Sequence, residues 1–324
     1  MNYKNELIST KYKPSAISDF VFPIEFHNLL RALMDCGQLN LLLLGSCCSG
    51  KTSIIDLFIT HYYKGYSTRE RNENILYISQ LKDIGVQYFR NDLKIFCQSY
   101  SGIKNKKKIV VIDDIDGISE QTQQILRNCI DNYKSNVGFL CSCTTMSKVI
   151  ENIQSRLLIL KLPNLNTSRL LTVANKIIDN EQLSITTEAI TALVELSNNS
   201  MRLLISYLEL IYLLDIPVTK TNIYDMCTCI SFKSFDTYLS ELSDGNIVNA
   251  IGLVKELIGN GFNCMDVYTN LFTYIKIKYK TRIELQYKLI RIICSYISVF
   301  HELHEDDIEL AFLSRDLSKV LHAS

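Results

Sequence analysis

Apolar residues follow two different patterns along the chain. Up to about residue 163, short apolar runs alternate with segments of helical spacing, such as the segment from Lys51 to about Tyr63. The runs predict strands at 41–44, 75–78, 109–112, 139–142 and 157–160. Because short apolar strands that alternate with helices form parallel sheets covered on both faces, this part of the chain predicts a five-stranded α/β fold.

After Pro163 only the helical pattern continues. Leu170 opens a run of apolar residues at helical spacing, and no convincing strand follows it. The pattern predicts a small helical domain over 164–229 and an all-α bundle over 230–324. With the sheet domain at 1–163, we predict three domains.

Composition and charge exclude several classes of protein. The 324 residues include 34 Lys+Arg and 34 Asp+Glu, so the formal net charge is zero. That balance argues against a wholly basic nucleic-acid coat, but not against a local basic surface. The only basic run, 104–108, is interpreted as a solvated loop, with a phosphate contact as the alternative. With 47% hydrophobic residues, 4 Pro and 12 Gly, the chain is neither disordered nor fibrous.

Neither a membrane span nor a disulfide scaffold is predicted. The longest apolar run, 41–44, is far too short to cross a membrane, so we expect no membrane partner. The eleven cysteines are odd in number and sparse compared with small secreted disulfide domains, and no signal-peptide pattern opens the chain. We therefore expect a reduced, intracellular protein that is not secreted.

The strongest chemical motif lies directly after the first predicted strand. Residues 45–52 fit G-x-x-x-x-G-K-[ST], with an apolar strand before them and a helix after them. In such a loop, glycines let backbone N–H groups wrap around a phosphate at a helix N-terminus. The lysine is expected to reach the β- and γ-phosphates, and the threonine hydroxyl to ligate Mg²⁺. The predicted nucleotide-binding residues are Gly45, Ser46, Cys47, Cys48, Ser49, Gly50, Lys51 and Thr52.

An acidic pair ends the third predicted strand. Asp113 and Asp114 directly follow the apolar run 109–112. A carboxylate at the end of a buried strand is costly unless it meets a cation or water. Asp113 is therefore predicted to hold Mg²⁺ through water, and Asp114 to orient or activate the attacking water. The alternative is a helix N-cap beside a solvated carboxylate.

Two arginines keep open roles as long as spacing alone is considered. Arg156 stands just before the last predicted strand. It is either a surface residue or an arginine finger, a guanidinium donated to a γ-phosphate bound on a neighbouring subunit. Arg202 opens a helix of the second domain. It is either an ordinary cation or a lid residue that reports which nucleotide is bound.

The order of these motifs resembles the small subunits of the replication factor C clamp loader, within the AAA+ ATPases. Five further segments carry the resemblance, with their family counterparts in parentheses: TKYKP and ISDFV at 10–21 (E-K-Y-R-P, L-D-D-I-V), ISQLKDIGVQYFR at 78–90 (N-A-S-D-E-R-G-I-x-x-V-R), DDID and QQILR at 113–127 (D-E-A-D, A-Q-x-A-L-R), SKVI to QSR at 147–156 (S-K-I-I…Q-S-R-C) and SMR at 200–202 (D-M-R). The motifs cover about residues 10 to 230, and beyond 230 the length and helical pattern match the family's collar domain.

The resemblance implies a fold, cofactors and partners. The fold is an α/β AAA+ P-loop domain with a parallel five-stranded sheet, followed by a small helical lid domain and an all-α C-terminal collar that serves oligomerisation. The implied cofactors are ATP and Mg²⁺. The implied partners are other clamp-loader subunits in a heteropentamer, a sliding clamp and primer–template DNA. The implied location is the nucleus or another intracellular site of DNA replication.

The resemblance also implies roles around the nucleotide. Tyr12 and Val21 belong to the segment that wraps the adenine, and Thr144 stands at the first sensor position. Arg156 is the finger for the ATP of a neighbour, and Arg202 is the lid sensor. Thr144 replaces the usual Asn, so this position keeps a hydroxyl but loses an amide. Asp114 replaces the usual catalytic Glu with a carboxylate one methylene shorter, so hydrolysis is expected to be slow.

Two cations are implied to contact DNA. Arg90 and Lys148 match positions that face the phosphate backbone of primer–template DNA inside the ring, and the alternative is that they are ordinary solvated cations. Such contacts are independent of sequence and sensitive to salt. Ile84 stands where the family has an arginine that contacts DNA, so the grip on DNA is expected to be weaker.

The sequence therefore predicts a clamp-loader subunit. It is expected to use ATP binding and hydrolysis to open a ring clamp and load it onto primer–template DNA. Two alternatives stay open. One is a structural subunit that binds ATP but hydrolyses it weakly or not at all, and the other is a different DNA-associated AAA+ ATPase.

Overall fold

The computed structural model describes residues 7–79, 86–214, 217–227, 230, 232–277, 283–302 and 306–322. The chain divides into two compact units, which we describe separately. The sheet unit comprises the chain up to Asn180 together with Asn199–Glu209. The helical unit comprises Glu181–Asn198 and the chain from Leu210 onward.

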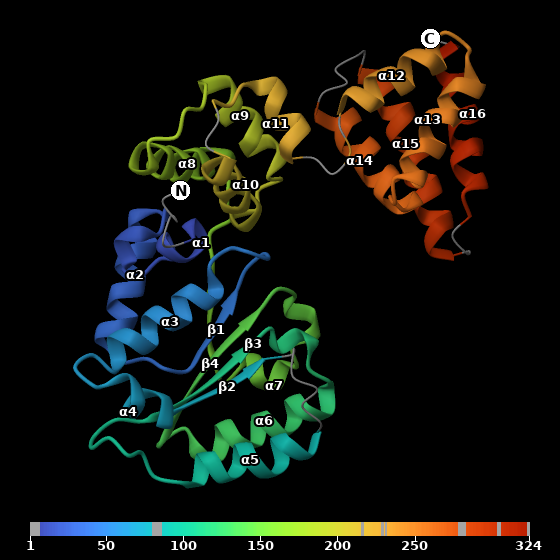
Figure 1. Ribbon diagram of the computed structural model, residues 1–324. Helices are drawn as coiled ribbons and strands as arrows, with labels where there is room; N and C mark the ends of the chain where they lie inside the picture. Colours follow the sequence, from blue (N-terminus) through green and yellow to red (C-terminus); the bar gives the residue numbers. More distant parts are fainter. Residues whose placement is uncertain are drawn as a thin grey trace. The chain divides into compact units, whose positions relative to one another are not determined.

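Within the described part of the sheet unit, five strands form one parallel sheet in the order β2-β3-β4-β1-β5 (Figure 1). The strands are β1 (Leu41–Leu44), β2 (Ile75–Ser79), β3 (Lys108–Asp113), β4 (Val137–Cys143) and β5 (Leu158–Lys161). β1 lies inside the sheet, because Leu41 pairs with Leu140 on one side and with Leu158 on the other. The predicted parallel five-stranded sheet is confirmed.

Helices connect and cover these strands. Those of the sheet unit are α1 (Ile8–Lys11), η1 (Ile17–Asp19), α2 (Ile24–Asp35), α3 (Lys51–Tyr62), α4 (Thr68–Glu73), α5 (Val86–Gln98), η2 (Ile115–Gly117), α6 (Glu120–Tyr133), η3 (Met146–Lys148), α7 (Glu151–Gln154) and most of α8 (Thr167–Glu181). α10 (Met201–Leu214) has residues in both units.

The sheet separates two apolar layers. Successive side chains of a strand face opposite sides, so β1 contributes to both layers. Leu41 and Leu43 pack with Ile54 of α3, whereas Leu42 packs with Leu126 of α6. In Figure 1, α2 and α3 accordingly lie on one face of the sheet, and α5 and α6 lie on the other. A strand that is buried on both faces has no polar alternation, which explains the unbroken run of leucines.

α2 and α4 are among the helices of the sheet unit that lie outside the predicted elements. α2 buries Leu30 and Met34, and its partly buried Phe26 and Leu33 pack against the same apolar layer. α4 begins with a capping box: the hydroxyl of Ser67 accepts a hydrogen bond from the N–H of Glu70, and the Glu70 carboxylate accepts one from the N–H of Ser67 at 2.9 Å. The S-x-x-E spacing of this box is readable in the sequence.

The basic run 104–108 packs against the sheet unit, and its interpretation as a solvated loop is wrong for Lys108. This side chain is 7% exposed, and its Nζ donates to Ser99 Oγ at 2.6 Å and lies 4.4 Å from the ring centroid of Phe96. Lys106 Nζ donates to the carbonyl of Tyr62 at 2.8 Å and lies 4.3 Å from the Tyr62 ring centroid. Both lysines therefore make cation–π contacts inside the fold.

The helical unit is built from α9 (Thr187–Leu196), α11 (Lys220–Cys227), α12 (Phe232–Ser243), α13 (Ile247–Gly259), α14 (Cys264–Ile277), α15 (Ile283–Glu302) and α16 (Ile308–His322). Tyrosine hydroxyls join these helices through buried and part-buried polar contacts. Tyr238 Oη and Ser314 Oγ lie 2.8 Å apart, and Tyr296 Oη donates to Asp316 at 2.8 Å. The predicted domain boundaries at 163 and 229 stay predictions. Among the described helices, none is both long and apolar enough to cross a membrane.

Candidate nucleotide-binding site

The loop 45–50 joins β1 to α3 at the carboxyl edge of the sheet. Its backbone takes left-handed conformations at Cys48 (φ 61°) and Gly50 (φ 93°). A Cβ on Gly50 would lie 3.3 Å from the ring of Phe20, and a Cβ on Gly45 would lie 2.6 Å from Ser49 Oγ. The loop therefore needs glycine at both motif positions, for space at Gly45 and for backbone conformation at Gly50.

Lys51 opens α3, and its ammonium lies against the loop. The residue is 7% exposed, and Nζ donates to the carbonyl oxygens of Gly45 (2.9 Å) and Ser46 (3.1 Å). The first N–H groups of a helix have no intrahelical partner, so a cation beside them completes a site for an anion. These features fit a bound phosphate.

Carboxylate and hydroxyl oxygens meet beside the loop. Asp113 ends β3, and its Oδ2 accepts a hydrogen bond from Thr52 Oγ1 at 3.0 Å. Its Oδ1 accepts a second one from Ser142, a buried residue of β4. Oxygen atoms of this kind are the ligands that Mg²⁺ prefers, and an ion here would bridge them to a bound phosphate. The two residues predicted to hold magnesium, Thr52 and Asp113, therefore fit it.

Asp114 takes a left-handed backbone conformation (φ 53°) at the start of η2. Its N–H donates to Ser142 Oγ at 2.9 Å. Burial raises the pKa of the Asp114 carboxyl, and the charge of Asp113 adds to the effect. A raised pKa makes a carboxylate a better proton acceptor, which suits the predicted role beside an attacking water.

Asp116 organises the sensor position, although the sequence analysis assigns it no role. Its Oδ2 accepts hydrogen bonds from the hydroxyl of Thr144 (2.7 Å), the N–H of Thr144 (3.2 Å) and the N–H of Thr145 (2.9 Å). Burial acts to raise the pKa of Asp116, but these hydrogen bonds outweigh it and lower the pKa. The hydroxyl of Thr144 donates its single hydrogen to Asp116. A phosphate oxygen must displace that bond to receive one from Thr144, and the sensor role stays a prediction.

Arg202 and the two loop cysteines lie near one another. Cys47 Sγ and Cys48 Sγ are 3.5 Å apart, and this contact raises the pKa of the Cys47 thiol. The charges of Arg202 and Lys51 act in the opposite direction on the same thiol. The predicted lid sensor, exposed at the start of α10, therefore lies within electrostatic reach of the loop.

The N-terminal segment approaches the loop through Phe20. This buried side chain lies beside Gly50 and stacks on Phe22, with ring centroids 5.2 Å apart. Tyr12 and Val21, which are predicted to wrap the adenine, are half-buried in the same segment. Their role stays a prediction. The sequence analysis assigns no role to Phe20, and only its place between the two predicted residues points to it.

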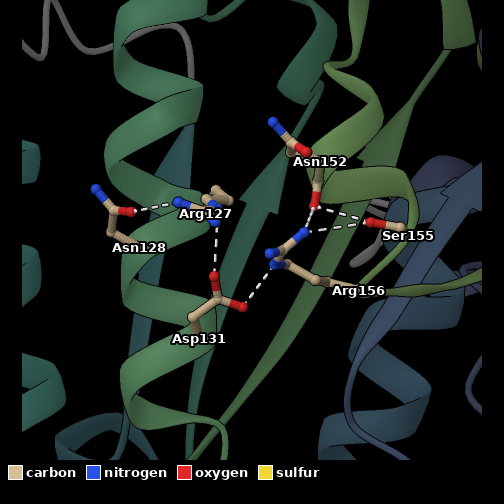
Figure 2. A network of polar contacts seen from close by, with 6 residues as sticks. All are labelled: Arg127, Asn128, Asp131, Asn152, Ser155 and Arg156. Atoms are coloured by element: carbon tan, nitrogen blue, oxygen red, sulfur yellow. Dashed lines mark hydrogen bonds and ion pairs between the residues drawn. The ribbon is translucent and has the colours of Figure 1, made fainter.

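Arg156, the predicted arginine finger, is held by other groups of the sheet unit (Figure 2). Its Nε donates to Asp131 Oδ1 at 2.5 Å, and its Nη1 donates to the carbonyl of Asn152 at 2.6 Å. Asp131, in the last turn of α6, also lies 3.2 Å from Nε of Arg127. Among the described residues, these contacts do not join Arg156 to the loop of its own chain. The same contacts fit an ordinary surface residue, so the role of Arg156 as a finger stays a prediction.

Comparisons with known proteins find a family match within the sheet unit and relatives along most of the chain. The family model described as "ATPase family associated with various cellular activities (AAA)" matches residues 41–162. Replication factor C subunit 4 of Oryza sativa subsp. japonica is 27% identical over 268 residues, which are 82% of this chain and 79% of that protein. The replication factor C small subunit of Picrophilus torridus is 26% identical over 269 residues, 82% of this chain and 83% of that protein.

The chain carries an AAA domain and is a relative of the replication factor C small subunits. The resemblance drawn from its motifs is therefore confirmed. A solved structure of a Thermotoga maritima RuvB variant has a TM-score of 0.50 and 14% identity to it, over 67% of this chain and 70% of that one. At this identity the likeness shows a shared fold alone. The AAA match contains the loop, Asp113 and Arg156, whereas Arg202 lies beyond it.

The AAA domain also carries the two residues predicted to face DNA. Lys148 is exposed in η3, and its carbonyl accepts a hydrogen bond from Nε2 of the buried Gln123 at 2.9 Å. The same Gln123 side chain accepts a bond from the N–H of Ile150 at 2.9 Å, so it fixes the backbone around Lys148. Arg90 lies on α5, but its side chain and the whole of Ile84 lie outside the described residues. The sequence analysis assigns Gln123 no role.

Proposed function

We propose that this chain is a subunit of a sliding-clamp loader. It uses ATP binding and hydrolysis to open a ring clamp and load it onto primer–template DNA during replication. The observation that carries the proposal is the meeting of Thr52 with Asp113 beside the buried Lys51, which supports a site for MgATP. The likeness to replication factor C subunits of a plant and an archaeon supports the clamp-loader assignment.

In this proposal the chain's own site holds the nucleotide. Residues 45–50 bind the triphosphate through backbone N–H groups, and Lys51 neutralises the β- and γ-phosphates. Thr52 and Asp113 would hold Mg²⁺, Asp113 through water, and the ion would offset negative charge on the phosphates. Asp114 orients the attacking water, and Thr144 and Arg202 sense the γ-phosphate. Tyr12 and Val21 enclose the adenine.

The remaining roles concern partners. Arg156 reaches the γ-phosphate of ATP bound to a neighbouring subunit, so hydrolysis depends on assembly. Arg90 and Lys148 contact phosphates of primer–template DNA without regard to sequence. ATP drives the cycle because the open and closed states of the ring differ in affinity for it. The chain works with other loader subunits and a clamp, at the intracellular site of DNA replication.

One observation favours a second candidate, a subunit that binds ATP but hydrolyses it weakly or not at all. Asp114 is one methylene shorter than the glutamate of the family's motif, and its N–H is bound to Ser142 Oγ at 2.9 Å. A short carboxylate on a fixed backbone must reach the attacking water from farther back. The binding part of the site is the same in both candidates.

Clamp loading by the purified complex tests the proposal. The complex is isolated through a tag on this chain, and ring clamps retained on primed circular DNA are counted with and without ATP. Lys51→Ala is expected to abolish ATP-dependent loading while the complex still assembles. Lys64→Ala, a change of an exposed lysine after α3, is the matched control and should load normally. Full loading by Asp114→Ala favours the second candidate, and a homohexamer with helicase activity contradicts both.

A further inference from the structure

Arg127, Asp131 and Arg156 form a cluster that keeps one positive charge (Figure 2). Asp131 Oδ1 accepts from Arg156 Nε, and Asp131 Oδ2 lies 3.2 Å from Arg127 Nε. A single carboxylate is thus shared by two guanidinium groups. Because it neutralises only one of them, the cluster still attracts an anion.

The hydrogen bonds of Arg156 leave one end of its guanidinium available. Nε donates to Asp131, and Nη1 donates to the carbonyl of Asn152 (2.6 Å) and to Ser155 Oγ (3.2 Å). In the part of the chain that the structure describes, Nη2 has no hydrogen-bond partner. A guanidinium is a rigid plane with five N–H donors. Two fixed nitrogens therefore set the orientation of the plane and leave the third for an incoming oxygen.

The degree of exposure suits such a role. The side chain of Arg156 is 26% exposed and that of Asp131 is 36% exposed, so the pair is neither sealed in the core nor free in water. An arginine side chain loses considerable rotamer entropy when it is fixed. A contact within the chain that fixes it beforehand lowers the entropy that remains to be lost when a second chain binds.

We infer that Asp131 is a positioning residue for the arginine finger: it fixes the guanidinium of Arg156 so that Nη2 is presented to the γ-phosphate of ATP on a neighbouring subunit. The inference rests on the proposed function, in which Arg156 acts on a neighbour. Asp131 contacts neither nucleotide nor metal in this scheme and acts only through Arg156. An ion pair that instead withheld Arg156 from the phosphate would have the opposite effect on turnover.

The test compares variants of this chain in the purified complex. Asp131→Ala removes the carboxylate, and Asp131→Asn keeps an acceptor of the same shape without the charge. Glu73→Gln is the matched control, because Glu73 forms an exposed ion pair with Arg69 at 3.4 Å on α4. kcat and KM for ATP are measured for each variant, for Arg156→Ala and for the double variant. The Nε–Hε resonance of Arg156 is followed by NMR in the isolated chain.

The inference predicts a loss in kcat and not in KM. Asp131→Ala is expected to lower kcat about 10- to 100-fold through misplacement of the finger. Asp131→Asn should lower kcat less than Asp131→Ala does, and Glu73→Gln should leave kcat unchanged. Arg156→Ala should lower kcat roughly 1,000-fold, and the double variant should be no slower than Arg156→Ala. In the isolated chain, Asp131→Ala should shift the Nε–Hε resonance to the position of a solvated arginine.

Several outcomes would overturn the inference. A rise in kcat for Asp131→Ala would show that the ion pair withholds Arg156, and unchanged kcat would show that the finger is positioned without it. Additive losses in the double variant would show that Asp131 acts independently of Arg156. If Arg156→Ala turns over normally while Lys51→Ala is inactive, the positioning role falls but ATP hydrolysis stands. If Lys51→Ala also turns over normally, the proposed function fails as well.

Discussion

The loop 45–50 and the Arg127–Asp131–Arg156 cluster are two charged regions of one AAA domain. Different kinds of contact hold the cation in each region. In the loop, the ammonium of Lys51 is held by main-chain carbonyls five and six residues away. In the cluster, Arg156 is held by a side chain 25 residues away on α6. The loop therefore depends on backbone shape, whereas the cluster depends on the identity of one carboxylate.

The two regions are therefore expected to tolerate different substitutions. In the proposed function the loop tolerates Cys47 and Cys48, because its backbone N–H groups rather than its side chains would bind the phosphate. It does not accept a Cβ on Gly45, which would meet Ser49 Oγ. In the cluster, the carboxylate of Asp131 is the acceptor that a single substitution can remove, although the main-chain carbonyl of Asn152 also accepts from Arg156.

Removal of the loop cation should have the largest effect. Lys51→Ala is expected to weaken binding of MgATP to the isolated chain by about 100-fold or more, because it removes charge-assisted hydrogen bonds worth roughly 1.5–3 kcal/mol each. Fluorescent ATP analogues measure the affinity. Cys47→Ser is the internal comparison and should bind within about threefold of the parent. Equal losses in the two variants would contradict a loop that binds through its backbone and Lys51.

A methyl group on Gly45 should lower the free energy of unfolding. Gly45→Ala places a Cβ 2.6 Å from Ser49 Oγ and 3.1 Å from Leu162 Cβ. We expect a loss of about 1–3 kcal/mol in the free energy of unfolding, the usual cost of overpacking. Gly252→Ala, in α13 with nothing within 4 Å of the new Cβ, should gain about 0.5–1 kcal/mol. Denaturant titration measures both, and similar effects would mean that Gly45 is not constrained by space.

Loss of the Asp113 carboxylate, which is predicted to hold Mg²⁺, should have an intermediate effect. In Asp113→Asn the amide oxygen can still accept from Thr52 or Ser142, but the negative charge is gone. We expect the gain in nucleotide affinity that Mg²⁺ provides to fall about tenfold, which is roughly 1.4 kcal/mol. Binding of metal-free nucleotide should be unchanged. Magnesium titrations at fixed ATP analogue check this. Unchanged Mg²⁺ dependence would remove Asp113 from the metal site.

The smallest effect concerns the titration of Asp131. The hydrogen bond from Arg156 lowers the pKa of the Asp131 carboxyl, and Arg127 contributes less. A lowered pKa in the folded state contributes stability that is present above the ordinary aspartate value and is lost as pH falls through the folded value. Because Asp131 is partly exposed, this contribution is small.

Carboxyl NMR titration of Asp131 checks this prediction. Arg156→Ala should raise the pKa toward the ordinary aspartate value, and Arg127→Ala should raise it less. An equal effect of the two variants would mean that Asp131 is not coupled mainly to Arg156. It would also weaken the contrast with the loop, where the local backbone holds the cation.

The same contrast separates the features of the fold and the site that the sequence predicted from those that it did not. The strands and the loop 45–52 follow from local patterns, because short apolar runs and a contiguous motif specify them. The hydrogen bond between Thr52 and Asp113 joins residues 61 positions apart, and the sequence analysis predicts only a shared association with Mg²⁺. Asp116 lies in the DDID segment, but the hydrogen bonds that it accepts come from Thr144 and Thr145, 28 and 29 residues away, so that segment alone does not specify them. Asp131 carries no local signal, because it is one of many surface carboxylates and its partner is 25 residues away.

The surroundings of Lys108 and Phe20 were not predicted either, for a similar physical reason. Lys108 lies in a basic run that reads as solvated, and only the packing of Phe96 and Ser99 around it makes it a buried cation. Phe20 lies beside Gly50 because the N-terminal segment folds back onto the loop, which local periodicity does not specify. In each case a contact between distant segments determines the role of the residue.

The central claim is that this chain works as one member of a ring whose nucleotides bind between adjacent subunits. Native mass measurement of the complex purified through this chain, with and without a non-hydrolysable ATP analogue and with a ring clamp added, tests it most directly. We expect a five-subunit assembly that contains this chain and captures the clamp only when the analogue is present. A chain that stays single with the analogue bound, or that forms a homohexamer without capturing the clamp, would contradict it.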